Sequence, residues 1–203
     1  MNKKVIIIGA GGHAKVIADI IRSSGDTVEG FLDDSYTEDK AFYGAFVVGK
    51  ICEYERYASE CCFVIAIGSN AVREKIAKEL NCQWYTAIHP SAVVSESAKI
   101  GEGTVVMANA VINADATVGK HCIINTATVV EHDCTVGDYS HLSPRSVVCG
   151  ATSIGSHVWL GTGSTVVNVV SVCDGVTIGA GGVVVRSINE AGTYVGVPVM
   201  RIR

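Results

Sequence analysis

An aliphatic residue stands at every sixth position through the second half of this chain. The sixteen positions are Val94, Ile100, Val106, Ile112, Val118, Ile124, Val130, Val136, Leu142, Val148, Ile154, Leu160, Val166, Val172, Ile178 and Val184. Apolar residues make up 48% of the chain, so sixteen matches in sixteen positions are not a chance event. Such a repeat indicates a solenoid, whose coils are stabilised by stacking on their neighbours.

A second repeat gives the length of one coil. Gly101, Gly119, Gly137 and Gly155 recur every eighteen residues, each directly after an aliphatic position. A period of six within a period of eighteen predicts a triangular prism with three short strands per coil and about five coils. We expect the aliphatic side chains to fill the interior, and glycine to give the backbone conformational freedom at one corner of each coil.

Small side chains stand two residues before most of the aliphatic positions. They are Ala92, Ala98, Thr104, Ala110, Ala116, Cys122, Thr128, Cys134, Ser140, Ser146, Thr152 and Ser164, and the exceptions include Val158, Val170 and Val176. A small residue fits inside the prism beside the aliphatic one. We therefore interpret Cys122 and Cys134 as core residues rather than catalytic thiols.

Residues 1–86 have a different pattern. VIIIGA is suited to a buried strand, and GGHAKVIADIIRSSG predicts a helix that ends near Gly25. Further strands are expected in TVEGFLDD and CCFVIAIGS, and a second helix in NAVREKIAKELN. Strands that alternate with helices favour a small parallel sheet. The sequence thus predicts a Rossmann-like α/β half-domain at residues 1–86 and a parallel β-helix at residues 87–203.

Composition excludes several classes of function. The net charge is −4 and there is no run of lysine or arginine, so we expect no nucleic-acid partner. The eight cysteines are scattered without a C-x-x-C motif, which favours a reduced, cytoplasmic protein. The first apolar stretch is interrupted by His13, Lys15 and Asp19, so we expect neither a signal peptide nor membrane insertion.

Charged residues and two histidines interrupt the aliphatic pattern near its middle. His132 lies between Glu131 and Asp133, and His141 follows nine residues later, both at outward-facing positions. Nine residues are half a coil, which places the two imidazoles on opposite sides of one prism, on the order of 15 Å apart. They converge only if prisms pack side by side, with His132 of one chain facing His141 of the next. The adjacent carboxylates favour His132 as a general base.

Two other interpretations of the histidines lead away from catalysis. His121 and His157 each lie three residues past an aliphatic position, and we expect them to be solvated or packed at an interface. Metal binding is the alternative for the Glu-His-Asp stretch. The β-helical carbonic anhydrases bind zinc with three histidines, two of them five residues apart, and no H-x4-H occurs in this chain. We therefore expect no metal.

A glycine-rich loop marks a second candidate site. Residues 9–14, GAGGHA, fit G-x-G-x-x-A between the first strand and helix, and Asp33 and Asp34 end the next strand. A tight strand–helix turn is the alternative interpretation. Backbone N–H groups at the helix start could hold a pyrophosphate, with Asp33 or Asp34 bound to the base or ribose. NAD normally needs two such halves, so this single half favours a nucleotide-sugar.

Taken together, the motifs carry a family resemblance. IIIGAGGHAK, FLDD, AIGSN, INTATVVEHDCTVGDYSHLSP and VGVP span nearly the whole chain. In this combination the sequence resembles the bacterial PglD-like and NeuD-like sugar acetyltransferases of the hexapeptide-repeat superfamily, and most of all the UDP-4-amino-sugar N-acetyltransferases. The resemblance implies a left-handed β-helix, acetyl-CoA as co-substrate, and a homotrimer with active sites at the subunit interfaces.

The resemblance also implies roles for particular residues. The family's general base falls on His132, the acid that raises its basicity on Asp133, and the contact to the thioester region of acetyl-CoA on His141. Substrate contacts fall on Gly11, Gly12, His13, Asp33, Asp34 and Gly68, and coenzyme A contacts on Thr162 and Ala180, with Gly196 and Pro198 near its tail. Two departures stand out. Asp133 is one methylene shorter than the usual glutamate, which predicts a looser contact with His132, and Arg145 stands where a small residue is common.

The sequence therefore predicts an acetyl-CoA-dependent N-acetyltransferase that acts on the amine of a nucleotide-linked 4-amino-sugar. His132, with an ordinary pKa of ~6.5, would take the amine proton during direct transfer. A sugar or sialic acid O-acetyltransferase and a non-catalytic nucleotide-sugar-binding protein are the alternatives. The sialic acid branch typically lacks both an acid after the histidine and a histidine in the glycine loop, and this chain has both. Because no loop interrupts the solenoid, the N-terminal domain is expected to wall the site.

Overall fold

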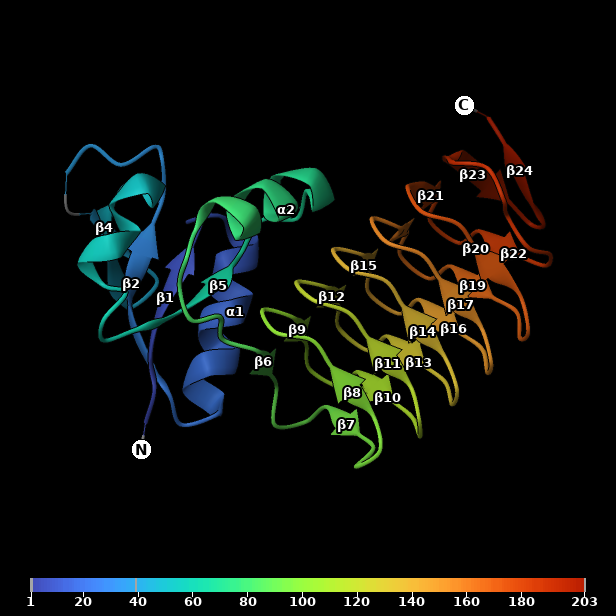
Figure 1. The fold of residues 1–203 in the computed structure, drawn as a ribbon, viewed down its shortest axis with the longest axis horizontal. Helices are drawn as coiled ribbons and strands as arrows, with labels where there is room; N and C mark the ends of the chain where they lie inside the picture. The colour runs from blue at the N-terminus through green and yellow to red at the C-terminus, as the bar shows by residue number, and fades with distance from the viewer. Residues whose placement is uncertain (1, 39, 203) are drawn as a thin grey trace.

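The N-terminal part is an open sheet with helices packed against it (Figure 1). The computed structural model describes residues 2–38 and 40–202. Its first elements are β1 (Lys4–Ile8), α1 (Gly12–Ser23), β2 (Thr27–Leu32), β3 (Lys40–Phe42), β4 (Ala45–Gly49), the 3-10 helix η1 (Ile51–Arg56), β5 (Cys62–Ile65) and α2 (Asn70–Glu79). The strand order is β3-β4-β2-β1-β5, and all pairs are parallel except β3–β4. The α/β prediction is confirmed, whereas the short β3–β4 hairpin and η1 were not predicted.

From residue 87 the chain winds into a parallel β-helix. Its strands are β6 (Ala87–Ile88), β7 (Val93–Val94), β8 (Lys99–Ile100), β9 (Val105–Val106), β10 (Val111–Ile112), β11 (Thr117–Val118), β12 (Ile123–Ile124), β13 (Val129–Val130), β14 (Thr135–Val136), β15 (His141–Leu142), β16 (Val147–Val148), β17 (Ser153–Ile154), β18 (Trp159–Leu160), β19 (Thr165–Val166), β20 (Ser171–Val172), β21 (Val176–Ile178), β22 (Val183–Val184), β23 (Gly192–Gly196) and β24 (Val199–Arg201). Residues eighteen apart are paired between coils, as Val111 is with Val129. The predicted coil length and the β-helix are confirmed.

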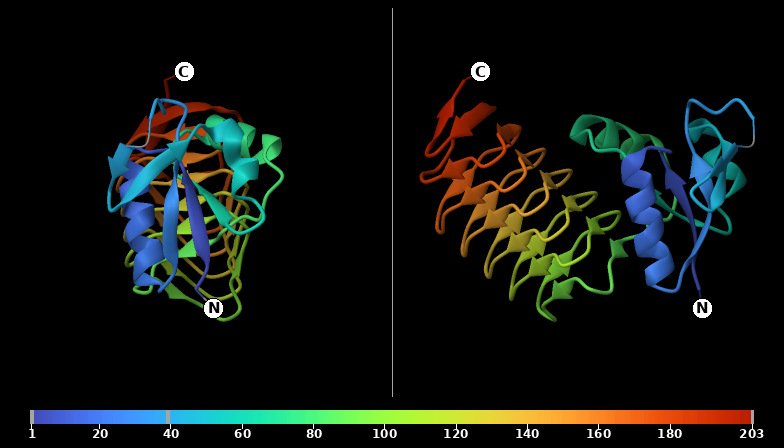
Figure 2. Two further views of the ribbon diagram at one scale, coloured as in Figure 1. Left: turned by 90° about the vertical axis from the view of Figure 1, so that its left-hand side faces the viewer. Right: turned by 180° about the vertical axis from the view of Figure 1, so that it is seen from behind.

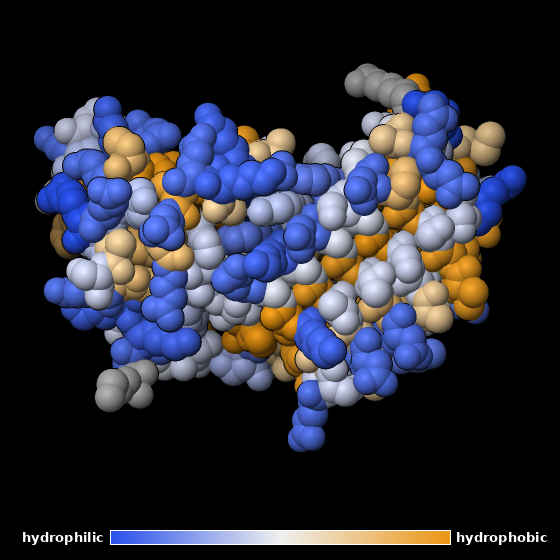
Figure 3. Space-filling view, in the orientation of Figure 1, coloured by the Kyte–Doolittle hydropathy of each residue, from blue (hydrophilic) through white to orange (hydrophobic). Residues whose placement is uncertain are grey.

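The three faces of the prism differ in the residues that point outward. The valine face (β7, β10, β13, β16, β19, β22) presents Val93, Val111, Val129, Val147, Thr165 and Val183. The polar face (β8, β11, β14, β17, β20) presents Lys99, Thr117, Thr135, Ser153 and Ser171, all exposed. The docking face (β6, β9, β12, β15, β18, β21, β23, β24) presents Val105, Ile123, His141, Trp159 and Thr177. In one view, hydrophobic residues form a band along the β-helix (Figure 3).

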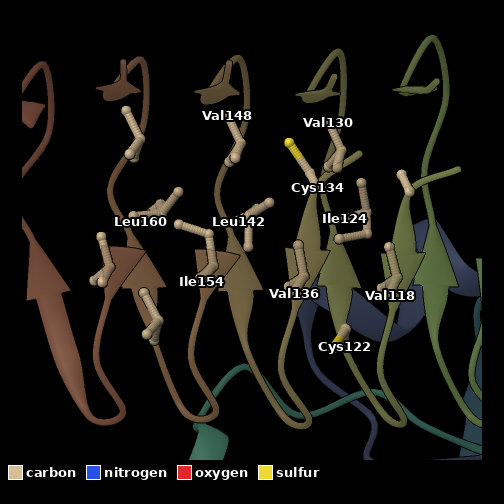
Figure 4. Packing of buried hydrophobic residues seen from close by; sticks show 14 of the residues in the cluster. Val118, Cys122, Ile124, Val130, Cys134, Val136, Leu142, Val148, Ile154 and Leu160 are labelled. Carbon is tan, nitrogen blue, oxygen red and sulfur yellow. The ribbon is translucent and has the colours of Figure 1, made fainter. Parts of the chain in front are cut away.

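The repeated aliphatic residues stack inside the prism (Figure 4). From Val106 to Val184 they are buried, and Cys122 and Cys134 lie among them with no exposed surface, so both cysteines are core residues as predicted. Val94 and Ile100 are only half-buried. They belong to the first coil, which has no coil below it to complete its interior.

The expectation that glycine gives the backbone conformational freedom at one corner of each coil was wrong. Left-handed backbone recurs at the third residue after most aliphatic positions, and it is adopted by Asn109, Asp115, His121, Ala127, Asp133, Tyr139, Arg145, Ala151, His157 and Val169 besides glycines. Gly101 and Gly137 are not among the left-handed residues. A Cβ on Gly137 would stand 2.5 Å from Ser156 N, and one on Gly101 would stand 2.5 Å from the carbonyl carbon of Gly119. Glycine is needed there because the next coil leaves no room.

The two parts share a hydrophobic core. Helix α1 lies between the α/β sheet and the β-helix, as the right-hand view of Figure 2 shows. Its Ile17 belongs to the same buried cluster as Val105 and Ile123, the first outward residues of the docking face. Trp84 pairs with β5, whereas Ala87 pairs with β9. Because the pairing partner changes between Trp84 and Ala87, we propose a domain boundary between residues 86 and 87.

Candidate active site

The glycine loop joins the end of β1 to the start of α1. Gly9 has a φ of +102°, a backbone conformation that would be strained in a residue with a side chain. Gly11 caps α1 without a side-chain hydrogen bond, and Cβ atoms added to Gly11 or Gly12 would meet nothing within 4 Å. The loop therefore leaves open space at a helix N-terminus, the kind of place where anions bind.

Asp33 holds this loop in place. Its Oδ2 accepts the Ala10 N–H at 2.8 Å, and its Oδ1 accepts both the N–H and the hydroxyl of Ser35. Burial raises the pKa of Asp33, but these hydrogen bonds outweigh it and hold the pKa below its usual value. Asp34 accepts the Ile51 N–H at 3.2 Å and lines a cavity of about 460 Å³ between η1 and α2. Of the two aspartates predicted to contact the substrate, Asp33 thus holds the loop, whereas Asp34 lines a cavity.

His13 and His141 are both half-buried, and both imidazoles have a lowered pKa. Burial, followed by the nearby charge of Arg73, lowers the pKa of His13 to about 4. Burial, then Arg73, then His13 lower the pKa of His141 to about 3. Asn125 Nδ2 lies 3.1 Å from His141 Nε2, while His13 Nε2 is buried without a hydrogen-bond partner among the described residues. Neither imidazole is suited to take a proton at neutral pH, but both can form hydrogen bonds with a ligand.

Arg73 of α2 fastens the α/β part to the β-helix. Its side chain is 1% exposed and donates to Tyr139 O at 2.6 Å and to His121 O at 2.8 Å, on successive coils. It also donates to Gly68 O at 3.0 Å, in the loop before α2. The carbonyl dipoles solvate a buried cation whose pKa burial lowers to about 10. This side chain therefore fixes the loop around Gly68 against the β-helix.

Asn70 extends the same attachment by one coil. Its Nδ2 donates to His157 O at 3.0 Å, eighteen residues beyond Tyr139. The start of α2 then faces outward residues of the docking face across a cavity of about 540 Å³, the first cavity. It is lined by Gly68, Ser69, Asn70, Ala71, His141, His157, Trp159 and Thr177. The N-terminal part thus forms one wall of this cavity, and that the cavity belongs to the active site stays a prediction.

A second cavity continues along the later coils. Its volume is about 230 Å³, and it is lined by Ser143, Trp159, Gly161, Thr162, Thr177, Ile178, Gly179 and Ala180. It shares Trp159 and Thr177 with the first cavity, so the two cavities adjoin, and together they are called the groove. The structure brings Thr162 and Ala180 together in the second half of this groove, with Gly68 and His141 in the first.

His132 lies elsewhere, at the corner between the valine face and the polar face. Its Nδ1 lies 2.8 Å from Asp133 Oδ2, so the shorter acid reaches the imidazole and the predicted looser contact was wrong. This hydrogen bond raises the pKa of His132. Both side chains are 61% exposed. Gly150 lies on the next coil, and a Cβ atom there would stand 2.7 Å from His132 Nε2. A glycine at this position therefore leaves room for the imidazole ring.

His121 and His157 are packing residues. His121 is buried, stacks on Tyr139 with 5.6 Å between ring centroids, and meets Trp84 edge-on. His157 stacks on the other side of Tyr139 and lies 3.4 Å from Glu74 of α2. Both therefore line the contact between the two parts, as the interface interpretation predicted.

Sequence reasoning missed several residues of the site. Arg73 and Asn70 were not singled out, although a charged residue on the buried side of a short helix is a detectable signal. Asn125, Gly150 and Trp159 gave no signal, since each acts through a residue sixteen or eighteen positions away.

Three further observations concern metal-binding groups, membrane-spanning helices and cysteines in the described residues 2–38 and 40–202. No group of three or more His, Cys, Asp or Glu side chains there is placed to hold a metal ion. None of the helices in these ranges has both the length and the apolar character to span a membrane. All eight cysteines are free thiols.

Comparison with known proteins matches both parts of the chain. Residues 4–80 match the PglD N-terminal domain, and residues 97–130 match the bacterial transferase hexapeptide family of six repeats. A curated relative, UDP-N-acetylbacillosamine N-acetyltransferase of Bacillus subtilis, is 43% identical over 115 residues. That alignment covers 52% of this chain, and the chain spans only about half, 52%, of that relative's length.

Solved structures match over the full length. The acetyltransferase domain of PglB from Neisseria gonorrhoeae is 37% identical, with a TM-score of 0.94 over 99% of this chain and 100% of that one. PerB from Caulobacter crescentus, solved in complex with CoA and GDP-perosamine, is 39% identical, with a TM-score of 0.92 over 98% of this chain and 97% of that one.

Proposed function

This chain belongs to the PglD-like sugar acetyltransferases, and from that premise we propose that it transfers an acetyl group from acetyl-CoA to the 4-amine of a nucleotide-linked sugar. The observation that carries the proposal is that the two cavities of the groove adjoin at Trp159 and Thr177, so that the first can serve as the acceptor cavity and the second as the donor cavity. The relatives support an amine acceptor, since one is named for N-acetylbacillosamine and another was solved with GDP-perosamine.

The nucleotide-sugar is assigned to the α/β side of the groove. Gly11 and Gly12 would leave space for the pyrophosphate at the start of α1, and Asp34 would bind the base or ribose from its cavity. The buried, unpartnered Nε2 of His13 supports its proposed role as a hydrogen-bonding contact of the substrate. Acetyl-CoA is assigned to the later coils, with Thr162 and Ala180 along the donor cavity and His141 near the thioester.

His132 is the proposed general base. A sugar amine must lose a proton as it attacks the thioester carbonyl, because the product amide is neutral. With Nδ1–H donated to Asp133, the free Nε2 can accept that proton while the sulfur leaves as a thiolate. The hydrogen bond to Asp133 raises the pKa of His132, which makes the imidazole a stronger base. No covalent acetyl-enzyme is required.

We assign the site to a trimer interface. His132 is absent from the lining of both cavities of its own chain, so that a neighbouring chain has to supply the base. The valine face supports this arrangement, because it carries five valines at outward positions where the polar face carries lysine, serine and threonine. Burying these valines against second and third copies would bring His132, at the edge of that face, towards a neighbour's groove.

Mass spectrometry of reactions with acetyl-CoA and a panel of UDP-, GDP- and dTDP-linked 4-amino-sugars tests the proposal. We expect a mass gain of one acetyl group on at least one amine, and none with the matched 4-hydroxy sugar. The His132→Ala variant is the control for uncatalysed acetylation. Acetylation of free sialic acid, with every nucleotide amine unchanged, would favour O-acetyl transfer and overturn the proposal.

A further inference from the structure

Trp159 stands at the junction of the two cavities. It is the outward residue of β18, paired with His141 of β15 on one side and Thr177 of β21 on the other. It lines both the acceptor cavity and the donor cavity, and it remains 49% exposed. A large aromatic ring therefore faces the point where the two substrates meet.

The indole is held in one orientation. Its Nε1–H donates to Ser143 Oγ at 2.9 Å, which fixes the edge of the ring. Its face is nearly parallel to the His141 imidazole, with 6.2 Å between centroids and 9° between planes. These two contacts restrict both side-chain torsions, so the ring cannot turn aside without breaking the hydrogen bond.

From this geometry we propose that Trp159 sets the length of the acyl group that is transferred, accepting acetyl and excluding longer chains. The inference rests on the function proposed above. In the transfer, the amine nitrogen bonds to the carbonyl carbon, the C–S bond breaks, the amine proton passes to His132 and the sulfur leaves as a thiolate. The carbonyl must then lie where the acceptor and donor cavities join.

We place the acyl chain against Trp159. During attack the carbonyl carbon is bonded to oxygen, sulfur and the amine nitrogen, so its one remaining substituent is the acyl chain, and Trp159 is the large side chain that lines both cavities at this junction. A methyl group adds little bulk, whereas each extra methylene would press on a ring that is fixed at its edge. Overpacking against a fixed group is unfavourable, and discrimination by one methylene reaches about 10-fold or more.

A competition between acyl donors tests this role. Wild-type enzyme with equimolar acetyl-, propionyl- and butyryl-CoA should form almost only the acetyl product. Trp159→Ala should raise the ratio of butyryl to acetyl kcat/KM by about 10-fold or more. Trp159→Leu and Trp159→Phe should give progressively smaller increases, so this series decides the question even if the alanine variant is inactive.

Trp84→Phe is the matched control. Trp84 contacts His121 edge-on at 4.7 Å and lines neither cavity, so its replacement should leave the acyl ratio unchanged. The inference is overturned if the ratio stays at the wild-type value throughout the Trp159 series, or if wild-type enzyme already prefers butyryl-CoA. A wild-type enzyme that transfers no acyl group to any sugar would instead refute the proposed function itself.

Discussion

The β-helix and the α/β part contribute to the groove in different ways. On the docking face, each coil of the β-helix contributes one outward side chain, and its type differs from coil to coil. Along successive coils these residues are Val105, Ile123, His141, Trp159 and Thr177. The α/β part instead contributes loops that follow its strands, around Gly11 and Gly68. The β-helix thus presents different outward side chains on a regular backbone. The loops of the α/β part have to be held against it by contacts between the two parts.

Glycine shows the same contrast. Gly119 belongs to the solenoid, where a Cβ would stand 2.8 Å from the backbone nitrogen of Asp138 on the next coil. Gly11 belongs to the α/β part, where a Cβ would meet nothing within 4 Å. One glycine permits the fold, and the other keeps open space for a ligand.

The largest effect is expected from His132→Ala, which tests whether a side chain of the β-helix is the general base. We expect kcat to fall by about 10²–10⁴, since a positioned general base is lost. The melting temperature should not change, because the side chain is exposed.

Mixing His132→Ala with His141→Ala then locates the site. After subunit exchange, about a quarter of the interfaces in random trimers would hold both histidines, and activity should return in that proportion. Exchange verified by native mass spectrometry without any recovery would contradict a site shared between chains.

The second largest effect is expected from the two glycines. Gly119→Ala should lower the free energy of unfolding by about 3 kcal/mol, because the backbone of the next coil has to move. Gly11→Val should leave the unfolding free energy unchanged but raise KM for the nucleotide-sugar far more than KM for acetyl-CoA. Thermal unfolding and steady-state kinetics measure both. Equal rises in the two KM values would mean that the glycine loop is only structural.

The smallest effect concerns the contact between the two parts at low pH. Burial lowers the pKa of His121 to about 4, so between pH 4 and about 6.5 the unfolded chain binds a proton that the folded chain does not. Stability should therefore fall as the pH drops through this window, with His121 accounting for about 2 kcal/mol at pH 5.

His121→Phe keeps the ring stacking and removes the titration, so its stability should depend less on pH. Urea unfolding at pH 5 and pH 8 measures the difference. A variant whose pH dependence equals that of the wild type would exclude His121 as the acid-sensitive group.

Much of the fold could be predicted because the interior of a triangular coil accepts so few side chains. Every sixth residue must be aliphatic, and from Val106 to Val184 the structure follows that rule. That Asp133 contacts His132 was likewise predictable, since the two are neighbours in the chain, but the close distance of 2.8 Å was not. The role of Gly137 was not, because the sequence shows a glycine without showing whether its flexibility or its small size is needed.

The sequence by itself determined the repeat, the two-part organisation and the family, since these depend on local patterns that recur at fixed spacing. Only the tertiary structure decided how the groove is assembled. Arg73 lies 48 residues from the His121 carbonyl and Asn70 lies 87 residues from that of His157. Trp159 belongs to both cavities only because β15, β18 and β21 stack side by side. Such contacts join positions that share no local pattern, so the folded chain alone brings them together.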